Sequence, residues 1–419
     1  MDMKKKGNAE FLRCDNCGKE IDIFEKVNLC PYCGGLLEVH YDINGLKRSA
    51  HVFKEYRKDS IWRYRDFFPR VEDNNIVSLG EGGTPLTKSV YIGPKLGIEN
   101  LYLKNDTLMP TGSFKDRGFS LAVSYAKELG VKKGFTYSSG NAGTSFAAYS
   151  SRGGLNSMIL VEYLANEVKK SMIRFHSDKV AIMEFESFEQ ITGMLEYAAK
   201  ELGLYQFVNF INPIRHEAMK TYAYEIYGEL SRVPNVMIHP VGTGGGLWGA
   251  LKGYNELCSM GVADRLPRMV GVQPECVAWI KQAILKNAKY GETYGDSEKT
   301  IAQSICGNAP IQDGRRLISA ILDSGGTAVG VSDEEILDAM LELAGEGISA
   351  EPAAASSVAA FKKLVEGGKI NSSDTVVCII TATGLKQTSA VARAAGVPTY
   401  HMTASPEGIL ATSRHFLEE

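Results

Sequence analysis

The 419-residue sequence contains no apolar run long enough to cross a bilayer, so we do not expect an integral membrane protein. Its formal net charge is only −3, which gives no electrostatic reason to expect nucleic acid or an anionic membrane as the main partner. No apolar core follows the basic residues near the N-terminus, so we expect no signal peptide there. Internal repeats and low-complexity tracts are also missing. The composition, 44% hydrophobic and 23% charged, is that of an ordinary soluble globular protein of two or three domains.

The eight cysteines are unevenly distributed. Four of them form two CxxC pairs near the N-terminus, Cys14 with Cys17 and Cys30 with Cys33, and glycine follows each pair. This spacing predicts a closed structural zinc ribbon; a redox pair and two disulfides are the alternatives. Such a module seldom does chemistry, and it could dock on the main body or support a subunit contact. The remaining cysteines are scattered among apolar neighbours, which indicates a reducing compartment and a cytoplasmic location.

The rest of the chain predicts an α/β architecture. Residues 46–75 are polar and aromatic and resemble a helical connector that wraps the main body. Beyond them, short runs rich in Val and Ile alternate with longer helical segments, which favours mostly parallel, buried strands. The expected strands include residues 101–104, 156–161, 179–183, 236–240, 269–272 and 375–380.

The most informative stretch is residues 110–118, Pro-Thr-Gly-Ser-Phe-Lys-Asp-Arg-Gly, which we call the lysine turn. It places Lys115 where a helix should begin, between a strand at 101–104 and helical spacing at 118–129. The positive end of a helix dipole disfavours the protonated amine and leaves it more nucleophilic. A Schiff-base lysine requires that property. The alternative is a solvated lysine in a helix cap.

Three later stretches could bind an oxygen-rich ligand. Ser138, Ser139 and Asn141 lie at a strand-to-helix junction and supply short polar side chains, although a capped helix start would look the same. Thr381 ends a buried strand, where ligands of open α/β sheets usually bind, and alone it would be structural. The third stretch lies between a strand and a helix and predicts a phosphate site, which we call the glycine cradle. It comprises Gly242, Thr243, Gly244, Gly245 and Gly246.

The glycine cradle also permits another interpretation. Gly244, Gly246 and Gly249 satisfy the GxGxxG spacing of dinucleotide-binding proteins, and Glu275 follows the next strand-like run. An NAD-dependent enzyme is therefore an alternative, but it would have no need for the lysine turn or the Ser-Gly-Asn loop.

Taken in order, these stretches resemble the fold-type-II pyridoxal-phosphate enzymes, and most closely the threonine synthase family. The family pattern extends to residues 82–86, 208–215 and 346–358, and the N-terminal CxxC pairs resemble the ribbon of some prokaryotic members. The resemblance implies two open, mostly parallel sheet domains and a small zinc-ribbon-like module. The implied parts are a module at 1–45, a large cofactor-binding domain at 46–117 and 226–419, and a small mobile domain at 118–225. It also implies a homodimer with a small amino-acid substrate.

The resemblance assigns a role to each candidate residue. Lys115 would hold pyridoxal 5'-phosphate as an internal aldimine and then move protons at Cα and Cβ. Asn141 would hydrogen-bond the phenolic oxygen of the cofactor, the glycine cradle its phosphate and Thr381 its pyridine nitrogen. A hydroxyl at that nitrogen suits elimination and replacement better than transamination. Facing the substrate would be Ser138, Ser139, Asn209 and Arg215, the last suited to a phosphate.

The sequence departs from the family at substrate positions. Ala142 and Phe210 stand where threonine synthases usually have hydroxyl residues. The cradle resembles that of dehydratases and cysteine synthases, and Thr-Ala-Thr-Gly replaces the usual Thr-Gly-His-Gly. The expected reaction is that of threonine synthase, which makes threonine and phosphate from O-phosphohomoserine and water. A related ammonia-lyase or β-replacing synthase for a serine-, threonine- or phosphoserine-like amino acid is the alternative. An NAD oxidoreductase and a non-catalytic, zinc-dependent interaction protein are the others.

Overall fold

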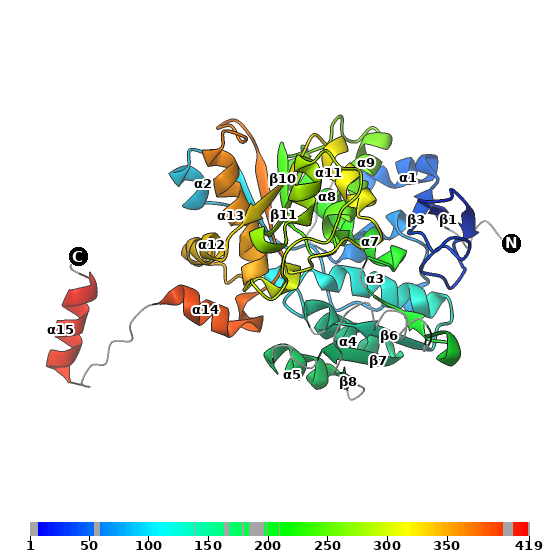
Figure 1. Ribbon diagram of the computed structural model, residues 1–419, viewed down its shortest axis with the longest axis horizontal. Helices are drawn as coiled ribbons and strands as arrows, with labels where there is room; N and C mark the ends of the chain where they lie inside the picture. Colours follow the sequence, from blue (N-terminus) through cyan, green and yellow to red (C-terminus); the bar gives the residue numbers. More distant parts are fainter. Residues whose placement is uncertain are drawn as a thin grey trace.

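The computed structural model describes residues 7–53, 59–138, 140–162, 167–177, 180–183, 197, 199–208, 210–396 and 405–417. Two predicted site residues, Ser139 and Asn209, lie outside these ranges. Within them, no helix has both the length and the apolar character needed to cross a membrane. The strands build three separate sheets, and the two larger ones are mostly parallel (Figure 1), as the sequence predicts for an α/β protein.

The N-terminal module is a three-stranded antiparallel sheet at one end of the molecule (Figure 1). Its order is β2 (Glu20–Asp22), β1 (Ala9–Cys14), β3 (Leu37–Tyr41). The connector that follows begins with α1 (Ile43–Ser49) and continues as short 3-10 turns at Ala50–Phe53, Ile61–Phe67 and Asp73–Asn75. In the described part of the expected helical connector, 3-10 turns cover more residues than α-helix, and Tyr64 departs from helical backbone angles inside the longest turn.

The large sheet has the order β12 (Thr327–Val331), β11 (Arg268–Pro274), β10 (Val236–Pro240), β13 (Val376–Ile380), β5 (Leu101–Asn105), β4 (Leu86–Lys88). All neighbours are parallel except β4, which pairs antiparallel with β5. Successive residues of β10 face opposite sides: Val236 and Ile238 join one hydrophobic cluster and Met237 joins another. Because helices cover both faces, the central strands β10 and β13 are mostly apolar and fully buried rather than alternating.

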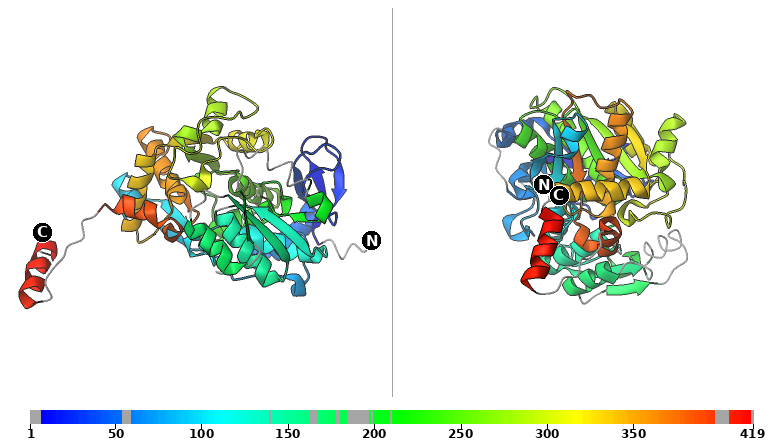
Figure 2. Two further views of the ribbon diagram at one scale, coloured as in Figure 1. Left: turned by 60° about the horizontal axis from the view of Figure 1, so that its bottom comes forward. Right: turned by 90° about the vertical axis from the view of Figure 1, so that its left-hand side faces the viewer.

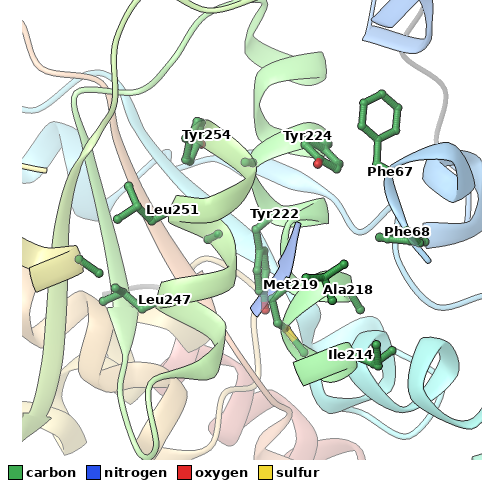
Figure 3. Close-up of a cluster of buried hydrophobic side chains, with 14 of the residues drawn as sticks. Phe67, Phe68, Ile214, Ala218, Met219, Tyr222, Tyr224, Leu247, Leu251 and Tyr254 are labelled. Carbon is green, nitrogen blue, oxygen red and sulfur yellow. The ribbon is translucent and has the colours of Figure 1, made fainter. Parts of the chain in front are cut away.

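Helices on one side of the large sheet share the cluster of Val236 and Ile238. They are α2 (Ile92–Lys95), α12 (Asp333–Gly345), α13 (Pro352–Glu366) and α14 (Thr388–Ala395). The other side carries α7 (Pro213–Met219), α8 (Thr221–Leu230), α9 (Gly245–Ser259), α10 (Trp279–Leu285) and α11 (Arg315–Asp323). Figure 3 shows this second cluster, in which Leu251 and Tyr254 of α9 lie across from Tyr222 and Tyr224 of α8. Phe67 of the connector packs on Tyr224, with ring centroids 5.3 Å apart.

The small sheet is fully parallel, with the order β8 (Val180–Met183), β7 (Asn156–Glu162), β6 (Lys133–Tyr137), β9 (Tyr205–Gln206). Helices α3 (Lys115–Glu128), α4 (Asn141–Gly153) and α5 (Glu167–His176) belong to this part. Helix α3 packs against both α4 and α7, so it lies between the two sheets (Figure 1). It begins three residues before the helical spacing at 118–129, directly at Lys115.

The predicted domain limits cut two of these helices. The limit at 117/118 falls inside α3 and the limit at 225/226 inside α8. The assignment of domains stays a prediction. The last described helix, α15 (Pro406–Leu417), lies apart from the sheets in Figure 1 and in the left-hand view of Figure 2.

Candidate active site

Three predicted site segments follow adjacent strands of the large sheet. The lysine turn comes after β5, Thr381 after β13 and the glycine cradle after β10, and these strands are neighbours in the order β10, β13, β5. The Phe114 amide donates to the Thr381 carbonyl at 2.8 Å, and the Thr383 amide donates to the Gly112 carbonyl at 3.0 Å. The structure therefore brings these segments together at the carboxyl edge of the sheet, where open α/β sheets bind ligands.

The lysine turn is held in shape by the residue after Lys115. The buried Asp116 carboxylate accepts hydrogen bonds from the Thr111 amide at 2.7 Å, the Thr111 hydroxyl at 2.6 Å and the Ser145 hydroxyl at 2.6 Å. Burial raises the pKa of Asp116 to about 6, although these bonds oppose the shift. Since Ser145 belongs to α4, the same carboxylate ties the turn to the small sheet.

Lys115 is the first residue of α3, and its surroundings lower the pKa of its amine. Burial lowers the pKa of Lys115 to about 7, and the charge of Arg215 adds to this shift. The Glu351 carboxylate acts in the opposite direction. The sequence predicts a lowered pKa through the helix dipole, and the structure adds burial, which is the largest cause of the shift. Near neutral pH a substantial fraction of this amine is the free base, as a nucleophilic lysine requires.

Arg117 fixes the first turn of α3 through buried ion pairs with Asp106 and Glu225. Its guanidinium makes two hydrogen bonds of 3.0 Å to Asp106 and one of 2.9 Å to Glu225, and all three side chains are buried. Glu225 comes from α8 and also pairs with buried Lys104 at 2.9 Å. A bidentate, fully desolvated pair fixes geometry strictly, so Lys115 projects from a rigid helix start.

Asn141 begins α4 and reaches across the site to the large-sheet side. Its amide nitrogen donates to the Glu351 carboxylate at 2.8 Å and lies 3.4 Å from the Ser304 hydroxyl. Lys169 of α5 approaches the same two residues, 3.4 Å from Ser304 and 3.9 Å from Glu351. Polar groups from both sheets therefore converge beside Lys115.

The glycine cradle leads into the 15-residue helix α9, whose first two residues are Gly245 and Gly246. Gly244 has φ +88°, and a Cβ there would lie 2.5 Å from Leu317. At Gly246 a Cβ would lie 2.5 Å from the ring of His239, whose pKa burial lowers to about 4. Close packing behind the loop therefore requires glycine at these two positions, and the cradle itself forms the N-terminus of a long helix. That arrangement fits a phosphate group.

Several buried polar atoms at the site lack a hydrogen-bond partner within the described residues. Such atoms are rare in folded proteins and point to a polar ligand. They are Ser113 Oγ, Asn141 Oδ1, Arg215 Nε, Glu351 Oε2 and Lys386 Nζ. Together with a reactive amine and a phosphate cradle, this set fits a phosphorylated aldehyde cofactor and an amino-acid substrate.

The structure describes two of the four predicted substrate residues, Ser138 and Arg215. Ser138 precedes α4, and its hydroxyl accepts from the Gly140 amide at 3.2 Å. Arg215 is buried, donates to the Phe207 carbonyl at 3.0 Å and stacks 4.0 Å from the Phe119 ring centroid. Burial lowers the pKa of Arg215 to about 9. Its charge acts on Lys115, so it lies near the reactive amine, and whether it contacts substrate stays a prediction.

Sequence reasoning assigned no role to four residues of the site: Ser304, Glu351, Lys169 and Lys386. Glu351 and Lys386 lie in segments that carry the family resemblance, at 346–358 and 381–386, and that was the available signal. Burial lowers the pKa of Lys386 to about 8, while Asp116 and Glu351 oppose the shift. These residues are separated by long stretches of chain, so only the fold shows that they meet.

The four N-terminal cysteines also come together. Their sulfur atoms all lie within 4.8 Å of one another, with Cys14 and Cys33 at 3.5 Å and Cys17 and Cys30 at 3.7 Å. Tetrahedral Zn–S bonds of about 2.3 Å place sulfurs about 3.8 Å apart, so this donor set fits zinc. All eight cysteines are free thiols, which does not support the disulfide alternative.

Comparison with known proteins identifies the matching family. The family model described as "Pyridoxal-phosphate dependent enzyme" matches residues 77–382. Threonine synthase of Methanocaldococcus jannaschii is 41% identical over 390 residues, covering 92% of this chain and 95% of the relative. That of Methanosarcina acetivorans is 36% identical over 393 residues, covering 93% and 95%. A solved tomato threonine deaminase has a TM-score of 0.63 at 20% identity, covering 75% of this chain and 88% of that one, and it supports the fold alone.

The family match includes the glycines that satisfied the dinucleotide spacing. Gly249 lies inside α9, where a Cβ would stand 2.5 Å from the His216 carbonyl of α7, so this glycine serves helix packing. Glu275 pairs with Lys281 at 2.7 Å. The NAD alternative is therefore set aside.

Proposed function

We propose, from the premise that this chain belongs to the threonine synthases within the pyridoxal-phosphate dependent enzymes, that it converts O-phosphohomoserine and water to threonine and phosphate. The observation that supports this most is the Lys115 amine, with a pKa lowered to about 7, beside Glu351 and the groups around Asn141. The family and the relatives of nearly full length support the class of reaction.

Different residues of the chain would bind different groups of the cofactor. Lys115 would attach it, the glycine cradle would bind its phosphate, Asn141 would orient its ring and Thr381 would hydrogen-bond its pyridine nitrogen. When bound, pyridoxal phosphate supplies the electron sink that stabilises negative charge next to the substrate α-carbon. The Lys115 amine then moves protons at Cα and Cβ, a task for which a pKa near neutrality is suited.

The phosphate end of the substrate would be held by cations rather than by the hydroxyls that Ala142 and Phe210 replace. Arg215, Lys169 and Lys386 are all buried, and Lys386 has an unpartnered amine among the described residues. Buried cations without full compensation favour a dianionic ligand such as a phosphate ester. This is the basis for preferring a phosphorylated substrate.

A second candidate is an ammonia-lyase or β-replacing enzyme acting on a serine-, threonine- or phosphoserine-like amino acid. Phe210 favours it, because phenylalanine offers no hydroxyl to a substrate phosphate. The Phe210 residue has φ +63°, and its buried side chain packs on His216 with ring centroids 5.0 Å apart. One substrate panel separates the candidates. O-Phosphohomoserine should yield phosphate and threonine, and failure to release phosphate would reject the first proposal. A keto acid with ammonia from L-serine or L-threonine would favour the second.

We also propose that the four N-terminal cysteines hold a structural zinc ion, which supports the ribbon and takes no part in the reaction. The sulfur distances given above support this assignment. Metal analysis of the purified protein should give about one zinc per chain, and a value near zero in protein purified without chelator would reject it.

We further propose that the protein is a cytoplasmic homodimer. Exposed apolar side chains on α15, Ile409 and Leu410, lie apart from the sheets and offer a surface for a second copy. The free thiols of all eight cysteines fit a reducing compartment. Light scattering coupled to gel filtration should give about twice the chain mass, and removal of residues 405–419 should shift that mass toward one chain.

A further inference from the structure

Each CxxC pair and the glycine after it form a turn that we call a knuckle, the first at residues 14–18 and the second at residues 30–34. The first knuckle contacts the N-terminus of α11. Asp15, next to ligand candidate Cys14, accepts a 2.6 Å hydrogen bond from Arg316 Nε. Arg316 is only 6% exposed and also donates to the Leu37 carbonyl at 3.2 Å. Asn16, the next residue of the knuckle, accepts from Arg315 at 3.0 Å. Two successive arginines of α11 are thus held by two successive residues between the cysteines.

The second knuckle contacts the loop that leads into α11. The carbonyl of Gly34, directly after Cys33, accepts from Gln312 Nε2 at 3.3 Å. Gln312 has φ +56°, a conformation that a non-glycine residue keeps only when its surroundings hold it there. Both knuckles therefore act on one segment, residues 312–316.

Helix α11 in turn supports the glycine cradle. Its Leu317, the residue after Arg316, packs so closely on Gly244 that a Cβ at Gly244 would lie 2.5 Å away. The Arg316 guanidinium also lies 4.5 Å from the ring centroid of Trp248, in the first turn of α9. Two neighbouring residues of α11, Arg316 and Leu317, thus connect the first cysteine knuckle to the glycine cradle.

The rest of the ribbon is attached to the body through contacts that do not involve the knuckles. Tyr41 of β3 donates to Glu217 of α7 at 2.7 Å, and Lys252 of α9 pairs with Glu38 of β3 at 3.3 Å. Asn28 donates to the Gln206 carbonyl of β9 at 2.9 Å. Loss of a metal would therefore loosen the knuckles while these contacts keep the ribbon docked.

We propose that the four-cysteine ribbon positions the glycine cradle: the metal fixes the knuckles, the knuckles fix Arg315 and Arg316, and Leu317 fixes Gly244. Arg316 is a positioning residue in this scheme. The inference rests on the proposed role of the cradle in binding the cofactor phosphate. It predicts coupling between two sites, and such coupling is reciprocal.

The main test measures both affinities on the full chain. Zinc-stripped protein, prepared with a chelator under reducing conditions, should bind pyridoxal phosphate about fivefold or more weakly than zinc-loaded protein in an absorbance titration. Zinc affinity, measured by competition with a chromogenic chelator, should fall by the same factor when the cofactor is absent. Equal cofactor affinity with and without zinc, or equal zinc affinity with and without cofactor, overturns the proposal.

Substitutions test whether Arg316 connects the metal site to cofactor binding. Arg316→Met should weaken cofactor binding to a similar extent, and stripping zinc from this variant should add little, because both changes break one path. Arg13→Met is the matched control: Arg13 also pairs with a carboxylate at 2.6 Å, but within the ribbon and half-exposed, and it should leave cofactor affinity unchanged. Fully additive effects of Arg316→Met and zinc removal would contradict the scheme. If Arg316→Met does not fold, Asp15→Asn provides the same comparison.

A cradle variant separates this inference from the proposed function. Gly246→Ala should weaken cofactor binding whatever the ribbon does, because a Cβ there meets His239. If Gly246→Ala leaves cofactor affinity unchanged, the cradle assignment fails. If Gly246→Ala weakens binding while zinc removal does not, only the coupling fails.

Discussion

Asn141 and Glu351 join the two parallel sheets at the candidate site, where the Asn141 amide donates a 2.8 Å hydrogen bond to the Glu351 carboxylate. Asn141 starts α4 on the small sheet, and Glu351 precedes α13 on the large sheet. The Glu351 carboxylate also acts on Lys115, whose protonated form it favours. One carboxylate therefore contributes both to the alignment of the two sheets and to the charge state of the reactive amine.

The pH dependence of cofactor capture should follow the pKa of Lys115. The free amine attacks the cofactor aldehyde, and its pKa is lowered to about 7, so the capture rate of cofactor-free protein should rise through pH 7 and level off above it. Glu351→Gln removes a charge that raises this pKa, and the midpoint should move to lower pH. Stopped-flow absorbance measures the rate, and exposed Glu99→Gln should keep the original midpoint. A rate that still rises steeply above pH 9 would contradict this reading.

Lys115→Ala should abolish covalent attachment of the cofactor and lower the turnover number by about 100-fold or more, because the base that moves protons is removed. Loss of the visible absorbance of lysine-bound cofactor and a kinetic assay provide the two readouts. Lys127→Ala, near the other end of α3, serves as the control and should retain both. Unchanged turnover in Lys115→Ala would remove Lys115 from the reaction.

Arg117→Met should destabilise the protein by about 3–5 kcal/mol, since it removes the cation paired with the buried Asp106 carboxylate and one of the two cations paired with Glu225. Urea denaturation followed by circular dichroism measures the free energy of unfolding. Arg65→Met breaks a pair with Asp73 whose side chains are 45% and 81% exposed, and it should cost less than about 1 kcal/mol. Equal losses in the two variants would show that the Arg117 cluster does not anchor α3.

Cys30→Ser should lower the zinc content of the purified protein well below one ion per chain, because it removes one of four thiolate ligands. Cys258→Ser, a cysteine far from the cluster in sequence, should keep the full content. Metal analysis by mass spectrometry checks both. Full zinc in Cys30→Ser would place the metal elsewhere.

Local sequence patterns predicted the parts of the site that follow strands. The structure places Thr381 and the cradle after β13 and β10, and the lysine turn after β5 and a short 3-10 turn, and parallel strands bring their carboxyl ends to one edge. The roles assigned to these residues stay predictions. The role of Glu351 was not predicted, because its contact with Asn141 spans 210 residues of chain. Nor did any local signal show that burial lowers the pKa of Lys115. Such effects depend on which side chains surround a residue, and the fold alone determines that.

The central claim is tested most directly by following oxygen atoms from labelled water. Elimination breaks the Cγ–O bond of O-phosphohomoserine, and water then adds at Cβ, so turnover in H₂¹⁸O should place the label in the hydroxyl group of threonine. The phosphate released in equal amount should carry no label. Labelled phosphate with homoserine would indicate plain ester hydrolysis, and 2-oxobutyrate with ammonia would indicate a lyase. Either result would contradict the account.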